Sequence, residues 1–284
     1  MISGWRYYNH AAVPTTPPHI NPNLEPIENG SIWKSLGGGT ALLARWVTNW
    51  DCGIETNFWY VIKDAPFDIS SVKSKRRYEI NKGNKHFNTR QINPKEYVEE
   101  IYDITNEAYK TYPSSYRPNL NKEEFFKDVE TWDDYLVYGA FDLDDENNPL
   151  CGYARLKVRD KQIDFMNQKV IPSYERNGIN VALVYRILLD NEKQLNAGYY
   201  ICDGARNLVH ETAFQEYLEK YFGFRKAYCK LNIKYRPHLG WLIKALFPFR
   251  KLLYKVHVFP VIRKIMPIFT MEEIVRKDKY LKFE

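Results

Sequence analysis

Residues 170–183 read VIPSYERNGINVAL, and the expected fold follows from this stretch. A strand-like run ends at Ile171, and an apolar pattern with helical spacing begins at Ile179. A loop that leads into a helix N-terminus collects unpaired backbone N–H groups and a partial positive charge, which together hold a phosphate or pyrophosphate. Gly178 allows the backbone to approach a ligand closely. The stretch therefore predicts an anion-binding turn.

The spacing of apolar residues around this turn predicts a regular series of elements. The series is a strand at 87–92, helices at 94–109 and 122–132, strands at 135–142, 151–158 and 162–171, a helix at 179–194, a strand at 199–202, a helix at 208–221, and paired strands near 224–228 and 231–235. Asn121 is the expected cap of the second helix. Short turns join the three central strands and predict an antiparallel meander. The fold class is α+β, with a mixed, mostly antiparallel sheet flanked by helices.

The segments outside this series have patterns of their own. Five prolines before Ile27 predict an irregular arm. Strand-like runs at 40–47 and 56–62 predict a hairpin, and 70–83 predicts a short basic helix whose cations either face solvent or bind an anion. We expect an N-terminal extension over 1–86, a core domain over 87–236 and a basic helical tail over 237–284.

The loop and helix at 170–183 resemble motif A of the GNAT (GCN5-related N-acetyltransferase) family. In that motif a Val-x-Pro-x-Tyr-like strand end precedes a Gln/Arg-x-x-Gly-x-Gly/Ala loop. The matching positions are Val170, Pro172, Tyr174, Gly178, Ile179 and Leu183. Glu175 departs from the pattern, although Arg176 beside it compensates the charge, and Asn180 stands where the family prefers a small residue.

The resemblance implies a GNAT-like fold and acetyl-CoA or another acyl-CoA as the donor, with no metal. The residues implied to bind the donor are Val170, Ile171, Arg176, Asn177, Gly178, Ile179, Asn180 and Val181.

A second resemblance covers 217–224, YLEKYFGF, which is similar to the helix-to-strand Gly-Phe ending of the family. In many members a tyrosine four residues before that glycine protonates the leaving thiolate. Glu219 stands at that position here, so no acid is carried over from the family. We expect Tyr217 to replace it, with Tyr221 as the alternative.

Polar residues gather at 203–212, after the strand expected to lie parallel to the donor strand. In the GNAT fold these two strands splay, and the acceptor meets the thioester at the gap. Asp203, His210 and Glu211 are candidate proton acceptors, and Arg206 is a candidate for holding an anionic group. The alternative is structural, with Asp203-Gly204 as a turn, His210 as a surface residue and Thr212 as part of a helix cap.

The four cysteines form no Cys-x-x-Cys pair and have no histidine at metal-ligand spacing, so neither a zinc site nor a disulfide framework is expected. Cys202 is expected in the core rather than as an acyl-carrying nucleophile. With no secretory signal and no spanning helix in the sequence, the expected location is the cytoplasm, including the inner face of the membrane.

Charge is distributed unevenly along the chain. Residues 221–271 contain 11 Lys and Arg and no Asp or Glu, which leaves 30 basic against 35 acidic residues elsewhere. Apolar residues alternate with these cations, as a helix lying in the plane of an anionic membrane requires. We expect peripheral membrane contact through 237–270, broken into short helices at Pro248, Pro260 and Pro267. The alternative is a helical cover packed on the domain.

These features predict an acyltransferase that moves an acyl group from acyl-CoA to an amine or hydroxyl of a small or lipid-linked acceptor, of the cell-envelope type. One alternative follows from 73–83, which resembles the Fem peptidyltransferases and implies aminoacyl transfer from charged tRNA. Another is a non-catalytic GNAT-like protein that binds through its tail. No recognisable motif predicts binding of other nucleic acids.

Overall fold

The computed structural model describes residues 2–34, 36, 38–114, 117–208, 213–255 and 260–283. Its strands form two sheets, with the orders β1-β2-β3-β11 and β10-β4-β9-β8-β7-β6-β5. The chain divides into two units. Unit 1 comprises 1–61, 205–213 and 226–284, and unit 2 comprises 62–204 and 214–225.

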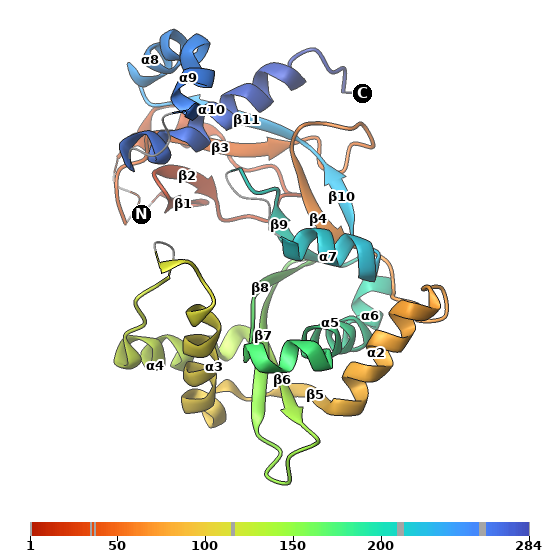
Figure 1. The fold of residues 1–284 in the computed structure, drawn as a ribbon. Coiled ribbons are helices and arrows are strands. Elements are labelled where there is room, and N and C mark those ends of the chain that lie inside the picture. The colour runs from red at the N-terminus through yellow and green to blue at the C-terminus, as the bar shows by residue number, and fades with distance from the viewer. Residues whose placement is uncertain are drawn as a thin grey trace. The chain divides into compact units, whose positions relative to one another are not determined.

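The seven-stranded sheet contains the predicted meander. Its strands are β4 (Trp59–Lys63), β5 (Phe87–Ile92), β6 (Tyr135–Asp142), β7 (Leu150–Arg159), β8 (Gln162–Val170), β9 (Tyr200–Ala205) and β10 (Arg225–Tyr228). The helices between β4 and β10 in the chain are α2 (Ser74–His86), α3 (Val98–Lys110), α4 (Lys122–Glu130), α5 (Ile179–Asp190), α6 (Glu192–Asn196) and α7 (Ala213–Phe222). In unit 2, α3 and α4 lie on one side of the meander, and α5 and α2 lie on the other (Figure 1).

The element order predicted between residues 87 and 235 is confirmed, and so is the α+β, GNAT-like fold class. Strands β5 to β8 pair antiparallel with their neighbours, whereas β8 and β9 pair in parallel. The predicted cap is present as well, because the Asn121 side chain accepts a hydrogen bond of 3.0 Å from the backbone N–H of Glu124.

Two predicted strand pairings are wrong. Only Cys229 separates β10 from β11 (Lys230–Tyr235), and a tight hairpin needs at least two loop residues. β10 therefore lies beside β4, while β11 pairs antiparallel with β3 (Leu43–Thr48) in the other sheet. The hairpin expected at 40–62 fails for a related reason: β3 and β4 belong to different sheets.

The arm predicted to be irregular contains a hairpin, β1 (Trp5–Tyr8) and β2 (Ala11–Pro14). Its two loop residues, Asn9 and His10, have φ values of 46° and 63°. Positive φ at both central positions is the conformation of the tight turns that suit antiparallel strands. The prolines do not prevent the pairing because they lie at or beyond the end of β2. Short helical turns follow at α1 (Glu25–Glu28) and η1 (Ser31–Trp33).

The tail is divided between a buried and an exposed part. Its elements are α8 (Leu239–Leu246), η6 (Phe247–Phe249), α9 (Arg250–Lys255) and α10 (Pro260–Asp278). The break expected at Pro267 is absent, since α10 runs through it. Burial of apolar side chains offsets the roughly 3 kcal/mol that a proline costs inside a helix. The buried residues of α10 in the core of unit 1 are Ile268, Phe269, Met271 and Ile274.

No helix among the described residues is long and apolar enough to cross a membrane.

Helix α2 packs on the start of α5 through two glycines. A Cβ at Gly83 would lie 2.7 Å from the carbonyl oxygen of Gly178, and a Cβ at Gly178 would lie 3.2 Å from the Cα of Gly83. A backbone atom cannot move away as a flexible side chain can. The approach of the two elements therefore requires glycine on α2.

We expect Gly83→Ala to destabilise the protein by about 1–3 kcal/mol, because the added methyl group forces α2 away from the Gly178 carbonyl. Replacing glycine by alanine inside a helix normally stabilises a protein by about 1 kcal/mol, so the expected change in stability has the opposite sign here. Gly240→Ala in α8 is the matched control, where the new Cβ meets Tyr235 at an ordinary 3.4 Å. Thermal unfolding compares the two, and equal effects would contradict the close approach.

Candidate functional site

Strands β8 and β9 separate after a short parallel pairing. Residues 162–164 pair with 200–202, and the pairing then stops although β8 continues to Val170 and β9 to Ala205. Met166 has no partner in β7, which makes it a bulge just beyond the last paired residue of β8. Bulges increase the local twist of a strand and redirect it. The gap thus opens at the carboxyl ends of two parallel strands, where ligands bind in many α/β sheets.

The first turn of α7 contacts both strands where they separate. Phe165 and Asp203 are the first residues beyond the paired segment on β8 and β9. The Phe165 ring lies 5.5 Å from the ring of Phe214, and the Gln215 side chain donates a hydrogen bond of 3.3 Å to the carbonyl oxygen of Asp203. Helix α7 is therefore fixed at the edge of the gap.

Asp203 has the acid–base properties of a proton acceptor. Burial raises the pKa of its carboxyl group to about 7, and a hydrogen bond from the Gln215 side chain opposes that rise. General bases work best when their pKa lies near the pH of the reaction. Asp203 was predicted as a candidate base, and the structure puts it at the gap.

Tyr217 lies further along α7 with a buried hydroxyl group. Its ring is nearly parallel to that of Phe214, at 5.9 Å, and also contacts Tyr221 and Phe222. Within the part of the chain that the structure describes, the hydroxyl has no hydrogen-bond partner. Burial raises its pKa, which the charge of Arg76 opposes, so the group stays protonated and able to donate.

Helix α2 contributes Arg76 to the same region. The Arg76 side chain is only 12% exposed, pairs with Glu79 and lies 3.1 Å over the ring centre of Tyr221. Its Nε atom is buried without a partner among the described residues, as is Oδ1 of Asn167 on β8. Buried polar atoms are normally hydrogen-bonded, so orphan atoms of this kind are available to a ligand or to water.

Neither Arg76 nor Asn167 is among the site residues predicted from the sequence. For Arg76 the spacing does contain the information: Arg76, Ile80 and Gly83 recur at helical intervals, which places them on one face of α2. Asn167 has no such pattern, because it lies beside a bulge.

Helix α2 also covers part of the loop predicted to bind the donor. That loop forms the 3-10 turn η5 (Pro172–Asn177), and the Gly178 N–H donates to the Glu175 carbonyl at 3.0 Å. Lys82 donates to the Arg176 carbonyl at 2.7 Å. Gly178 thus contacts α2 where the sequence analysis expected a ligand.

The other predicted donor-binding residues differ in accessibility. Asn180 Oδ1 accepts a hydrogen bond of 2.6 Å from Gln168, and Arg176 is exposed. Those that are buried are Val170, Ile179 and Val181, and those that are partly exposed are Ile171, Asn177 and Asn180.

The remaining predicted residues are His210, Glu211, Arg206 and Cys202. His210 and Glu211 lie outside the described residues. Arg206 belongs to unit 1, where its guanidinium group donates to the Asn57 carbonyl at 2.6 Å and lies 4.5 Å over the Trp59 ring. Cys202 is buried as predicted, and burial raises the pKa of its thiol.

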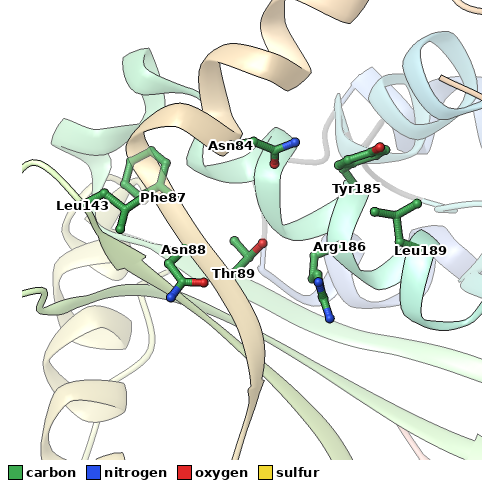
Figure 2. A pocket seen from close by; sticks show the side chains of 8 residues that line it. All are labelled: Asn84, Phe87, Asn88, Thr89, Leu143, Tyr185, Arg186 and Leu189. Carbon is green, nitrogen blue, oxygen red and sulfur yellow. The ribbon is translucent and has the colours of Figure 1, made fainter. Parts of the chain in front are cut away.

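A cavity of about 290 Å³ lies elsewhere in unit 2, between the end of α2, strand β5 and the second half of α5 (Figure 2). None of the predicted site residues lines it, and Arg186 at its wall is paired with Asp190 at 2.8 Å. The described residues contain no group of three side chains suited to hold a metal ion.

The sequence matches no protein-family model and no curated protein. Solved structures resemble the fold at low identity. The match to L-PGS from Bacillus licheniformis is 11% identical, covers 96% of this chain and 85% of that one, and has a TM-score of 0.53. The match to FemX is 9% identical, covers 65% of this chain and 63% of that one, and has a TM-score of 0.46. The match to the PaiA N-acetyltransferase of Thermoplasma acidophilum, solved with coenzyme A, is 21% identical and has a TM-score of 0.30. It covers 39% of this chain and 72% of that one.

The chain is therefore similar in fold to L-PGS over nearly its whole length. At these identities the likeness concerns the fold.

The raised pKa of Asp203 has a consequence for stability. The folded protein keeps a proton on this group up to about pH 7, whereas the unfolded chain loses it near the ordinary value of 3.8. The group therefore lowers the stability of the fold progressively as the pH rises between these two values. We expect Asp203→Asn to gain stability over the wild type across this window, by at most about 1.4 kcal/mol per pH unit. Urea unfolding at pH 4, 6 and 8 measures the difference, and a difference that does not change with pH would show a carboxyl group open to water.

Proposed function

We propose that the protein is an acyltransferase whose reaction takes place at the gap between β8 and β9. The observation that carries the proposal is the position of Asp203: a partly buried carboxyl group with a pKa of about 7, at the point where two parallel strands separate. The buried hydroxyl of Tyr217 on the adjoining helix, which has no hydrogen-bond partner among the described residues, supplies a proton donor.

The two residues have complementary roles in this proposal. The Asp203 carboxylate accepts a proton from the amine or hydroxyl of the acceptor as that group attacks the acyl carbonyl. A new C–N or C–O bond forms, and the bond from the acyl carbon to the departing sulfur or oxygen breaks. The Tyr217 hydroxyl donates its proton to that departing atom. We propose a small or lipid-linked acceptor of the cell-envelope type.

An acyl-CoA thioester is the first donor that we propose. The N-terminus of α5 and the exposed Arg176 provide positive charge for its phosphates. Because α2 lies against Gly178, the pyrophosphate has to approach the loop from the side that α2 leaves open.

An aminoacyl ester carried on tRNA is the second candidate donor, and the position of α2 favours it. The helix covers Gly178 and presents the exposed cations Lys73, Lys75 and Arg77. Cations on one helix suit the phosphate backbone of a nucleic acid better than a single pyrophosphate.

We expect Asp203→Asn and Tyr217→Phe each to lower kcat by roughly 100-fold or more, because each removes a proton transfer at the reacting atoms. Hydroxylamine serves as a surrogate amine acceptor, and release of free thiol or tRNA follows turnover. Tyr221→Phe is the matched control, since it removes a hydroxyl from the neighbouring ring of the same helix. A loss in Tyr221→Phe equal to that in Tyr217→Phe would contradict the assignment of the acid.

The donor is identified by binding to the wild type and to a Lys73→Gln/Lys75→Gln variant. If acyl-CoA is the donor, acetyl-CoA raises the melting temperature of both proteins equally. If aminoacyl-tRNA is the donor, the double variant binds it more weakly. The slope of the logarithm of the binding constant against the logarithm of the salt concentration then becomes less steep by about 2. Failure of both ligands to bind the wild type would contradict the transferase proposal.

A further inference from the structure

A basic and aromatic cavity in unit 1 is distinct from the acyl-transfer gap. Its volume is about 410 Å³, and its walls come from η1, the end of β11 and the first turns of α8. The residues that matter for its chemistry are the cations Lys234, Arg236 and Lys244 and the aromatic residues Trp33, Tyr235 and Trp241.

No described acidic residue forms an ion pair with the cations of this cavity. Lys234, Arg236 and Lys244 are exposed, and none of them forms an ion pair with a described residue. No acidic residue lines the walls. Glu272, the carboxylate that accepts the Tyr235 hydroxyl at 2.8 Å, is itself paired with Arg276 at 2.8 Å. Cations that converge without a carboxylate form a site for an anion.

Exposed apolar side chains follow the cavity along the chain. Ordinary soluble surfaces carry such residues singly, but four lie within one stretch of twelve residues here. Their exposed fractions are 68% for Trp241, 42% for Leu242, 60% for Phe249 and 62% for Leu252. Tryptophan is favoured at a membrane–water interface because its ring is apolar and its N–H is polar.

The buried part of the tail limits where a membrane can make contact. Ile243 and Phe247 face the core of unit 1, as do the buried residues of α10. The exposed apolar residues therefore belong to 241–252, and the cavity lies at the start of this segment. Cations next to exposed apolar groups match the arrangement of a phospholipid, whose phosphate lies just above its acyl chains.

We propose that this cavity binds the phosphate of an anionic phospholipid headgroup while Trp241, Leu242, Phe249 and Leu252 enter the interfacial layer of the membrane. The site lies in unit 1 and uses none of the residues of the acyl-transfer proposal. Either proposal therefore stands without the other.

Flotation of the full chain with lipid vesicles tests the site. The wild type is expected to bind vesicles of phosphatidylcholine that contain phosphatidylglycerol and to bind pure phosphatidylcholine much more weakly. Each Lys or Arg near an anionic surface contributes about 1 kcal/mol, so Lys234→Gln/Arg236→Gln is expected to weaken binding roughly 30-fold. Trp241→Ala is expected to weaken it without any change of charge.

The matched control is Lys161→Gln/Lys193→Gln, which removes the same charge from exposed positions in unit 2. The control is expected to bind as the wild type does, and all variants are expected to keep its melting temperature. Equal losses in the control and the cavity variant would overturn the site in favour of general charge attraction. Stabilisation by soluble glycerol phosphate, without any binding to vesicles, would identify a free phosphate compound as the ligand and overturn the membrane proposal.

Discussion

The separation of β8 from β9 is the constraint on which the candidate site depends. Beyond Asp164 and Cys202 the two strands no longer pair with each other, and backbone groups left without partners are costly unless another element or a ligand satisfies them. The first turn of α7 bridges the edge through Phe214 and Gln215. Asp203 lies directly beyond the last paired residue of β9, and Tyr217 follows Phe214 by about one turn of α7.

A second close contact affects which donor the gap can use. Gly83 and Gly178 bring α2 against the loop before α5. The Gly178 amide in this loop already donates a hydrogen bond to the Glu175 carbonyl. The same helix places Arg76 beside Tyr221 and near Tyr217. Helix α2 therefore covers part of the loop and at the same time places Arg76 against α7. The two effects are linked, because both follow from its position.

The order of the elements could be predicted because it depends on local patterns: apolar periodicity, the Asn121 cap and the short turns of the meander. The sheet to which each strand belongs could not. β10 and β11 are adjacent in sequence yet belong to different sheets, and periodicity carries no information about partners far away in the chain. Asp203 and Tyr217 could be named as candidates because their residue types suit proton transfer. Arg76 was missed because its helix reads as basic throughout.

The tail shows why composition alone cannot separate a membrane surface from a core helix. Residues 239–278 mix apolar and basic side chains along most of their length. In α10, Ile268, Phe269, Met271 and Ile274 are buried in the core of unit 1, whereas 241–252 leaves four apolar residues exposed. The prolines do not indicate where the helices of the tail end either, since α10 continues through Pro267. Whether an apolar side chain of the tail is buried depends on whether the surface that it faces provides an apolar partner. The sheet face that includes Leu43, Val47 and Leu231 does so for α10, and the described residues provide no such partner for Trp241 or Leu252.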